Sequence, residues 1–381
     1  MLLIMKYLCN FFPLLLMLFS ALTGCGQQAS LSNNPTDSIA TNKDSVENRV
    51  LPSEIKVMMM GDIMPGTQHP FNNRNAYLTN DDGKSLFNSV IPIIKEGDFI
   101  VGNLEGTFVD RSSSNDKHVN PSSQYVFMIP TRYAKLFKDA GFTALSVINN
   151  HANDMKNLGI ESTRKTLKEI GMPYSGFKAD GGYTIIDKDS VRYALCAFAT
   201  SANGNHIDDI ENSKKIVAEA KTKADIVIVS FHGGNEGKNA RHVPKKREFF
   251  RSGASRGDVY KFARACVDAG ADIVFGHSPH VCRAMEIYNG HIIAYSLGNF
   301  CTPYRMNVSG ISGYAPLLEV TIDSEGKFVK GKIHSFRQAK GRGPALDPTN
   351  AAAKEIRALS KEDMPQTYPQ ISDNGEISLR K

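Results

Sequence analysis

The sequence predicts an α/β protein with largely buried sheets. Short apolar runs recur along the chain, and segments with helical spacing of apolar residues alternate with them. Because these runs are nearly continuous, we expect strands that are buried on both faces. Glycines support the helix boundaries, since Gly141, Gly171 and Gly270 each follow a predicted helix at the position where glycine commonly ends one.

The elements follow in order along the chain, and ordered structure is expected to begin at Glu54. The predicted strands are 55–60, 98–102, 144–148, 193–199, 225–231, 272–275, 291–296 and 316–322. The predicted helices are 85–96, 131–140, 158–170, 211–223 and 258–269, with a weaker one over 350–360. Within 131–140, for example, Leu136, Phe137 and Ala140 fall at helical spacing.

The first two dozen residues resemble a bacterial lipoprotein signal peptide. Lys6 is the only charged side chain before Cys25, and the apolar run 11–19 is too short to span a membrane. The run ends in Leu22-Thr23-Gly24-Cys25, which is similar to a lipobox, where the cysteine is lipidated and becomes the N-terminus. An ordinary cleaved signal with a chance cysteine is the alternative. We therefore expect a cell-envelope protein with a lipid anchor at Cys25, at the periplasmic or outer face of a membrane.

Four regions result from these patterns. They are a signal peptide (1–24), a polar flexible tether (25–53), one large domain (54–340) and a C-terminal helix with a polar tail (341–381). Four cysteines remain in the mature domain, and they lack metal-ligand spacing: Cys196, Cys266, Cys282 and Cys301. A disulfide is compatible with an envelope location, but the sequence does not pair them.

Composition narrows the class of protein. Hydrophobic residues make up 41% and charged residues 22% of the 381, which excludes a disordered chain or a coiled coil. The formal net charge of +6 is too small to indicate nucleic acid as a partner, and it suits an anionic ligand.

Polar motifs follow six of the predicted strands, where each strand ends. They are Gly61-Asp62-Ile63-Met64, 102–106 (GNLEG), 149–154 (NNHAND), 232–236 (HGGNE), 276–280 (GHSPH) and 297–300 (LGNF). Ligands of α/β proteins bind outside the carboxyl ends of the strands, so these motifs are expected to converge. Asp, Glu, Asn and His form a mixed nitrogen and oxygen donor set that suits catalytic Mn²⁺, Fe or Zn²⁺. Two such metals can clamp a phosphoryl group and activate a water.

Each motif has a plainer interpretation when it is taken alone. Gly61-Asp62 could form a capped turn, Glu105 could be solvated, and His232 could be a satisfied strand-end histidine. Asp154 and Glu236 could orient a histidine or could cap the next helix. The joint placement of the motifs at successive strand ends favours a site.

The motif series resembles the bacterial capsule-synthesis, or poly-γ-glutamate synthesis, CapA-type family, which is similar to the calcineurin-like metallophosphoesterases. The resemblance covers about 55–340 and implies a four-layer αββα sandwich of metallophosphoesterase type, with the site at the strand ends. Family members are tied to export, anchoring or processing of anionic polymers.

The resemblance also implies roles for individual residues. Two metals would be held by Asp62, Glu105 (at the place of a bridging Asp), Asn150, His232, His277 and His280. His151 would be the general acid. Asn103, Asp154, Glu236 and Asn299 would orient these ligands or line the pocket, although Asn299 could instead be a turn residue. Met64 stands where classical members have a metal-ligating His, which puts one metal site in doubt, and Gly233 replaces the usual Trp of the fourth motif.

A basic stretch is particular to this chain. Residues 238–256 hold seven basic residues and one acidic residue. They could form a solvated face or an anion-binding lid, and for the lid we single out Lys245, Lys246 and Arg247.

The sequence therefore predicts a metal-dependent phosphoester hydrolase of the cell envelope that acts on an anionic polymer or on a phosphorylated glycan or lipid-linked substrate. A non-catalytic polymer-binding or anchoring factor is one alternative, favoured by Met64. A metal-dependent amide hydrolase acting on the polymer is the other.

Overall fold

The computed structural model describes residues 50–68, 81–110, 125–304 and 306–380. The predicted signal peptide, Cys25 and nearly all of the predicted tether lie outside these ranges. Within them, no helix combines the length and the apolar character needed to cross a membrane.

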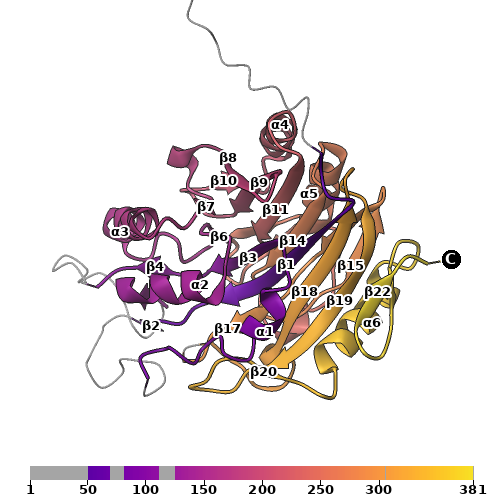
Figure 1. Ribbon diagram of the computed structural model, residues 1–381. Helices are drawn as coiled ribbons and strands as arrows, with labels where there is room; N and C mark the ends of the chain where they lie inside the picture. Colours follow the sequence, from indigo (N-terminus) through magenta and orange to yellow (C-terminus); the bar gives the residue numbers. More distant parts are fainter. Residues whose placement is uncertain (1–49, 69–80, 111–124, 305, 381) are drawn as a thin grey trace, which may run out of the picture. The chain divides into compact units, whose positions relative to one another are not determined.

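Two large sheets form the centre of the fold (Figure 1). The ten-stranded sheet has the order β21-β22-β19-β18-β1-β3-β6-β7, with β17 beside β1 and β20 beside β19. Its strands are β1 (Glu54–Ile63), β3 (Phe99–Leu104), β6 (Ala144–Ser146), β7 (Tyr174–Ser175), β17 (Asn299–Cys301), β18 (Tyr314–Asp323), β19 (Phe328–Arg337), β20 (Ala345–Leu346), β21 (Gln370–Ile371) and β22 (Glu376–Ser378). β1, β3, β6 and β7 run parallel, whereas β18 and β19 are antiparallel to their neighbours.

The seven-stranded sheet has the order β10-β9-β11-β14-β16-β15, with β8 beside β9. Its strands are β8 (Tyr183–Lys188), β9 (Val191–Ala199), β10 (Asn205–His206), β11 (Ile226–His232), β14 (Ile273–His277), β15 (Met285–Tyr288) and β16 (His291–Ala294). The smaller sheets are the hairpin of β12 (Glu248–Phe249) and β13 (Ser255–Gly257), and a three-stranded sheet of β2 (Thr67–Gln68), β4 (Thr107–Phe108) and β5 (Phe127–Ile129).

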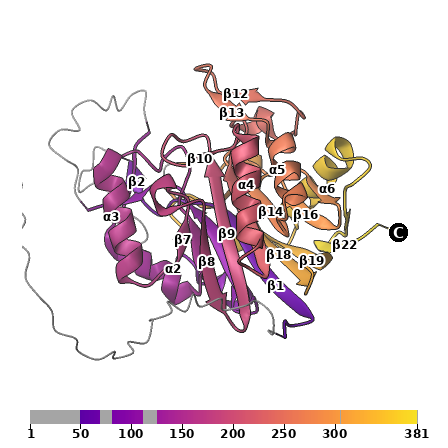
Figure 2. The same cartoon turned by 90° about the horizontal axis from the view of Figure 1, so that it is seen from above.

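Helices cover the outer face of each large sheet (Figure 2). The α-helices are α1 (Ile91–Ile94), α2 (Ala134–Ala140), α3 (Lys156–Glu169), α4 (Ile210–Lys221), α5 (Val259–Asp268) and α6 (Ala351–Asp363). Short 3₁₀ turns span Thr131–Tyr133, Lys178–Asp180, Lys238–Ala240 and Gly310–Gly313.

The alternation of side chains along β1 explains the layers. Val57 and Met59 point into the core between the two sheets, where they join Leu195 of β9. Met58 and Met60 point the other way, into the core beneath α2 and α3. A third core lies between the seven-stranded sheet and the helices α4 and α5, around residues such as Phe262. The predicted four-layer αββα sandwich is therefore confirmed, and the continuous apolar runs are strands buried on both faces.

The predicted elements are present, but one helix boundary is wrong. The helix expected over 85–96 is reduced to α1, and hydrogen-bonded turns replace its first part. Pro92 lies in the first turn of α1, where its missing N–H costs nothing, so it marks a helix start rather than an interior position. The helix expected over 350–360 corresponds to α6.

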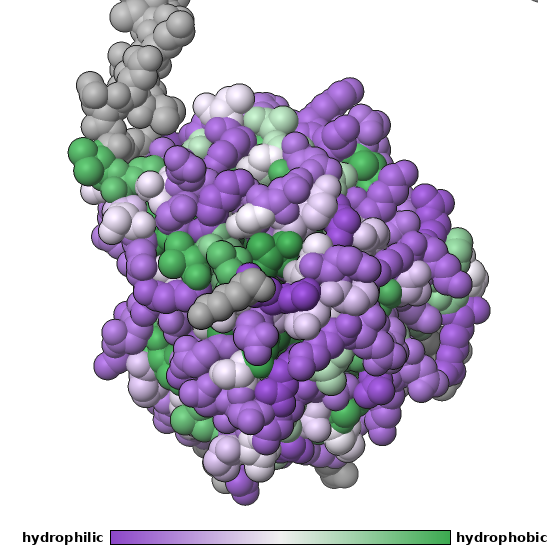
Figure 3. Space-filling model, turned by 90° about the vertical axis from the view of Figure 1, so that its right-hand side faces the viewer, coloured by the Kyte–Doolittle hydropathy of each residue, from purple (hydrophilic) through white to green (hydrophobic). Residues whose placement is uncertain are grey.

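The C-terminal residues add strands that the sequence analysis did not predict. β20 and β22 pair with β19 and so extend the ten-stranded sheet. The face that carries this part of the chain is mainly hydrophilic, with a small hydrophobic group near its middle (Figure 3). The cysteines at 196, 266, 282 and 301 are all buried and free, so none forms the disulfide that the sequence allowed.

Candidate metal centre

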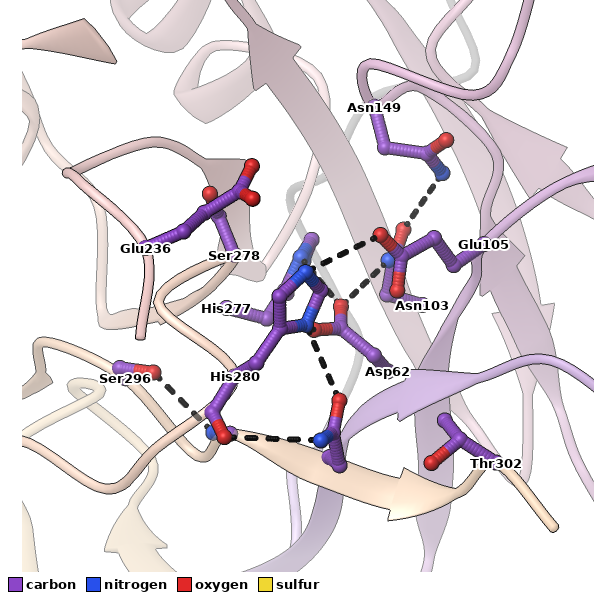
Figure 4. Close-up of polar contacts among 12 residues, drawn as sticks. Asp62, Asn103, Glu105, Asn149, Glu236, His277, Ser278, His280, Ser296 and Thr302 are labelled. Atoms are coloured by element: carbon purple, nitrogen blue, oxygen red, sulfur yellow. Dashed lines mark hydrogen bonds and ion pairs between the residues drawn. The ribbon is translucent and has the colours of Figure 1, made fainter. Parts of the chain in front are cut away.

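The polar motifs converge where the carboxyl ends of parallel strands from the two large sheets meet. Asp62 ends β1 in the ten-stranded sheet, and His232 and His277 end the parallel pair β11 and β14 in the seven-stranded sheet. The side chain of Asp62 nevertheless lies 3.7 Å from His232 and 3.3 Å from His277, measured from Oδ1 to each Nδ1. The two sheets thus supply opposite walls of one buried site (Figure 4).

A close backbone approach fixes the position of Asp62. A Cβ on Gly61 would lie 2.0 Å from the carbonyl oxygen of Gly298, so only glycine allows β1 to approach the chain that leads into β17. The Asp62 N–H donates to the same carbonyl over 2.9 Å. Asn103 of β3 then orients the side chain, because its Nδ2 donates to Asp62 Oδ1 over 2.8 Å.

Asp62 belongs to two overlapping groups of metal-ligand atoms. One group is Asp62, His232 and His277, and the other is Asp62, Glu105 and His280. Within each group the candidate ligand atoms lie within 4.8 Å of one another. The carboxylate shared by both groups is therefore Asp62, whereas the resemblance suggested Glu105 for the bridging position.

Glu105 is the least satisfied polar group of the site. It is fully buried, and neither carboxylate oxygen has a hydrogen-bond partner among the described residues. Its Oε1 lies 3.8 Å from His280 Nε2, 3.9 Å from His232 Nε2 and 4.0 Å from His151 Nε2. A buried carboxylate without hydrogen bonds is costly unless something else compensates its charge.

Two further residues of the polar motifs carry orphaned atoms. Nε2 of His232 and Oδ1 of Asn150 are buried and also lack partners in the described part of the chain. All these atoms belong to residue types that bind divalent transition metals, and none of them is a thiolate. The donor set therefore fits one or two divalent metals, which would supply the missing partners.

Burial and neighbouring charges shift the pKa values of several ionisable side chains at the site. Burial would raise the pKa of Asp62, but contacts with His277 and His280 hold that pKa well below its usual range. Burial and the nearby Asp62 carboxylate raise the pKa of Glu105 well above its usual range. Burial likewise lowers the pKa of His232.

The pKa of His280 is raised, whereas that of His232 is lowered. Burial would lower its pKa, but the carboxylates of Glu105 and Asp62 raise it to about 10. Its Nδ1 lies 3.1 Å from Asp62 Oδ2 and 3.0 Å from Asn299 Oδ1. Asn299 begins β17 in register with Asp62, so it contacts His280 rather than lining the cavity or forming a turn.

The loop that carries His280 has unusual backbone geometry. Ser278 and His280 have φ values of 114° and 56°, in the left-handed region that non-glycine residues rarely adopt. Such strain costs on the order of 1–3 kcal/mol per residue and is typical of functional sites. The loop is held in place by Arg256, whose guanidinium donates to Ser278 Oγ and to Glu236 Oε1.

His151 and Asp154 form a pair at the mouth of the site. His151 Nδ1 lies 2.8 Å from Asp154 Oδ2, which also accepts the N–H of Phe127 over 2.6 Å. The phenyl ring of Phe127 lies against the imidazole, with ring centroids 4.1 Å apart. The N-cap of α3 is Met155, so the carboxylate orients His151 rather than capping the helix. Glu236 is also not a cap, because Gly237 precedes the next 3₁₀ turn.

Asn149 and Asn150 have different surroundings. Asn149 Nδ2 donates to Asn103 Oδ1 over 3.2 Å and to the Leu104 carbonyl over 2.8 Å. It therefore connects two motifs, a contact that the sequence analysis missed because the two asparagines are adjacent and chemically alike. Asn150 keeps its carbonyl oxygen unpartnered, as a ligand would.

Ser230 is a second residue that sequence reasoning missed. Its Oγ lies 2.9 Å from His277 Nε2, and the other ring nitrogen of His277 lies 2.9 Å from His232 Nδ1. Ser230 and His232 are two residues apart on β11, so their side chains point to the same face of the sheet. That period of two could have identified Ser230.

Met64, at the place of the classical histidine, has its own partner. It is fully buried, and its sulfur accepts the N–H of Gly66 over 3.3 Å.

A cavity of about 380 Å³ opens beside the site. His151, Glu236 and His280 line it from the candidate site, and Lys238 and Arg251 line it from the basic stretch. Lys245, Lys246 and Arg247 are exposed and are not among its lining residues. Lys245 lies over the Tyr260 ring, and Arg247 pairs with Asp208 over 3.2 Å.

The sandwich and the donor set at its strand ends define a class, namely αββα proteins with a candidate metal centre at the carboxyl ends of the strands. The chain belongs to the bacterial capsule synthesis protein PGA_cap family, whose sequence profile matches residues 56–304. The family predicted from the six motifs is thus confirmed.

Two curated relatives are similar to this chain. The PGA biosynthesis protein CapA of Bacillus subtilis is 33% identical over 233 residues, which is 57% of this chain and 56% of that protein. The capsule biosynthesis protein CapA of Bacillus anthracis is 31% identical over 269 residues, which is 65% of this chain and 59% of that protein. The chain thus spans between half and two thirds of the length of these relatives.

Solved structures also resemble the chain. The calcineurin-like phosphoesterase YfkN of Bacillus subtilis matches with a TM-score of 0.44 and 12% identity, covering 74% of this chain and 91% of that one. A putative 5′-nucleotidase of Staphylococcus aureus matches with a TM-score of 0.42 and 16% identity, covering 81% and 58% respectively.

Proposed function

We propose that this protein is a metal-dependent hydrolase of the cell envelope that acts on a phosphoester bond during synthesis, export or anchoring of an anionic surface polymer. The observation that carries the proposal is the set of orphaned buried ligand atoms on Glu105, Asn150 and His232, beside a carboxylate shared by two ligand groups. The large majority of buried polar atoms in proteins have a hydrogen-bond partner, so unpartnered metal-ligand atoms within one series of motifs support a bound cation.

The residues that would hold the metals are those named from the sequence. One position would use Asp62, His232 and His277, and the other Asp62, Glu105 and His280, with Asn150 completing a shell. Two divalent cations held in this way would neutralise phosphoryl charge and lower the pKa of a bound water. This mixture of carboxylate, amide and imidazole donors suits Mn²⁺, Fe or Zn²⁺.

His151 would hold the proton that the leaving oxygen needs. Asp154 fixes Nδ1 as the protonated nitrogen by accepting its hydrogen bond, which leaves Nε2 directed toward Glu105 and the cavity. A proton on Nε2 could then be donated to a leaving alkoxide. The ring of Phe127, which lies tilted against the imidazole, limits its rotation.

The location rests on the sequence around Cys25. Leu22-Thr23-Gly24-Cys25 supports lipidation at Cys25 and hence anchoring to a membrane at the periplasmic or outer face. The family description as a capsule synthesis protein supports an anionic polymer, or a phosphorylated precursor of one, as the substrate.

A non-catalytic polymer-binding factor is the second candidate, and Met64 is the observation that favours it. Its sulfur is engaged by Gly66, so this position adds no ligand, and a site with fewer ligands could bind metal without turning over substrate. An amide hydrolase would use the same donors on a polymer amide, so only substrates distinguish it from a phosphoesterase.

The test compares the loss of His151, which pairs with Asp154, with the loss of His242, which pairs with Asp363 over a similar distance. Wild type, His151→Gln and His242→Gln are assayed on bis(p-nitrophenyl) phosphate and on a γ-glutamyl anilide, with Mn²⁺ or Zn²⁺ supplied. His242 Nδ1 lies 2.9 Å from Asp363 Oδ1, and neither residue lines the cavity, so His242→Gln controls for loss of such a pair. We expect phosphodiester turnover to fall about 100-fold or more in His151→Gln only. Turnover confined to the anilide, or no turnover by metal-loaded wild type, would refute the phosphoesterase.

A further inference from the structure

Two cations at the rim of the cavity have no acidic partner in the part of the chain that the structure describes. Lys238 and Arg251 line the cavity, and within the described ranges no ion pair or side-chain hydrogen bond engages either of them. Other cations of the same stretch are already engaged, as Arg256 binds Glu236 and Arg241 binds Glu355. The two unpaired charges are therefore the ones available to an anion inside the cavity.

The hairpin β12–β13 holds Arg251 at this position. Glu248, at its start, is buried and accepts two hydrogen bonds of 2.7 Å from the fully buried guanidinium of Arg283. Arg256, at its end, is also buried and donates to the carbonyl of Gly234 over 3.1 Å. Both ends are thus fixed by buried charged groups, and Phe250 and Arg251 at the tip are exposed. A tip fixed in this way loses little conformational entropy when it binds a ligand.

The rest of the cavity wall is apolar. Tyr125, Phe127, Phe250 and Met306 line it, and the side chains of Tyr125 and Phe250 are 64% and 39% exposed. Large aromatic side chains that remain exposed beside a polar site are typical of binding surfaces. The cavity therefore combines an apolar wall, a cationic rim and the candidate general acid His151.

We propose that this cavity is a subsite for the stretch of an anionic chain next to the reacting bond, in which Lys238 and Arg251 bind carboxylates of the chain and Phe250 packs on its methylene groups. The proposal rests on the function proposed above for the same site. It assigns substrate selection to the hairpin tip and the 238–240 turn, rather than to the 245–247 segment that the charge pattern had singled out.

The arrangement suits carboxylates carried on a carbon backbone. A γ-linked glutamate unit offers two methylene groups and one side carboxylate, so its apolar part can lie on the aromatic wall while its charge reaches the rim. A chain with phosphodiesters in its backbone would instead bring its charges against the apolar wall, where desolvation is costly. Neutral chains would leave both cations without a partner.

The test measures binding without turnover. Fluorescence anisotropy of a labelled deca-γ-glutamate is recorded at low salt with the full chain, as wild type and as Lys238→Glu, Arg251→Glu, Phe250→Ala and Lys246→Glu. Lys246 is the matched control, because it is an exposed cation of the same stretch that does not line the cavity. All four positions are exposed, so folding should persist, and a melting curve for each variant checks this.

We expect Lys238→Glu and Arg251→Glu each to weaken binding at least about tenfold, whereas Lys246→Glu changes it less than about threefold. The charge effects should shrink in 1 M salt, and the Phe250→Ala effect should not. Equal losses in all three charge variants would overturn the subsite, as would tight binding of deca-γ-glutamine or equally tight binding of tripolyphosphate. Binding as expected, together with no turnover of bis(p-nitrophenyl) phosphate by the metal-loaded wild type, would overturn only the catalytic proposal. Turnover of bis(p-nitrophenyl) phosphate by a wild type that does not bind the γ-glutamyl probe would overturn only the subsite.

Discussion

Of the contacts in the candidate subsite, the buried Arg283–Glu248 pair is the one whose removal should lower the stability of the fold most. In Arg283→Met, Glu248 loses two charge-assisted hydrogen bonds of 2.7 Å, while its side chain stays 8% exposed. Breaking a buried pair by removing one partner costs about 3–5 kcal/mol, because the remaining charge is left uncompensated. For a large domain this corresponds to a fall in Tm of roughly 6–20 °C. Denaturant unfolding followed by circular dichroism measures the change.

Two further variants make the reasoning refutable. Arg132 and Asp82 form a similar two-bond pair on the surface, with side chains 55% and 50% exposed, so Arg132→Met should cost less than about 1 kcal/mol. The double variant Arg283→Met/Glu248→Leu should regain at least about half of the lost stability, because no charge is left buried. A cost below about 1 kcal/mol for Arg283→Met, or no recovery in the double variant, would refute the account of the hairpin anchor.

Two other predictions concern the site and the sheet. Ser230→Ala should weaken binding of Zn²⁺ or Mn²⁺ about 10–100-fold in calorimetric titration, because His277 loses the partner that orients its ring; Ser175→Ala, whose buried hydroxyl has no partner among the described residues, should leave the affinity unchanged. The hydrogen bond from His334 lowers the pKa of Glu319 below its usual 4.5, so this pair stabilises the fold above that pH and the contribution is lost as pH falls through the lowered value. The stability gap between wild type and Glu319→Gln in urea unfolding should therefore narrow as the pH falls below 4.5, and a constant gap would contradict the pairing.

The apolar runs predicted the buried strands well because burial on both faces leaves a strong signal, whereas the four-layer arrangement was implied by the family resemblance. The run Val57-Met58-Met59-Met60 is apolar at every position, which only a strand covered on both sides requires. Short strands leave no such signal. β12 contains only Glu248 and Phe249, and β22 only three residues, so neither exceeds the pattern expected in a loop.

The site was predictable as a set of residues but not as a network. The rule that ligands gather at strand carboxyl ends brought Asp62, Glu105 and His232 together correctly in space. Which carboxylate two ligand groups share depends on side-chain direction, and the structure places Asp62 in that position. Likewise, a run of basic residues does not reveal which of them face a cavity, because a turn and a hairpin decide that Lys238 and Arg251 do.

Metal content tests the central claim most directly. The full chain, purified without chelator and then supplied with Mn²⁺ or Zn²⁺ and desalted, is analysed for transition metals by mass spectrometry, as wild type and as Asp62→Asn. Asp62 lies in both ligand groups, so the account predicts close to two metals per wild-type chain and loss of both in Asp62→Asn. Thermal melting confirms that the variant is folded. A wild-type chain that binds no metal, or a folded Asp62→Asn chain that keeps its full complement, would contradict the account.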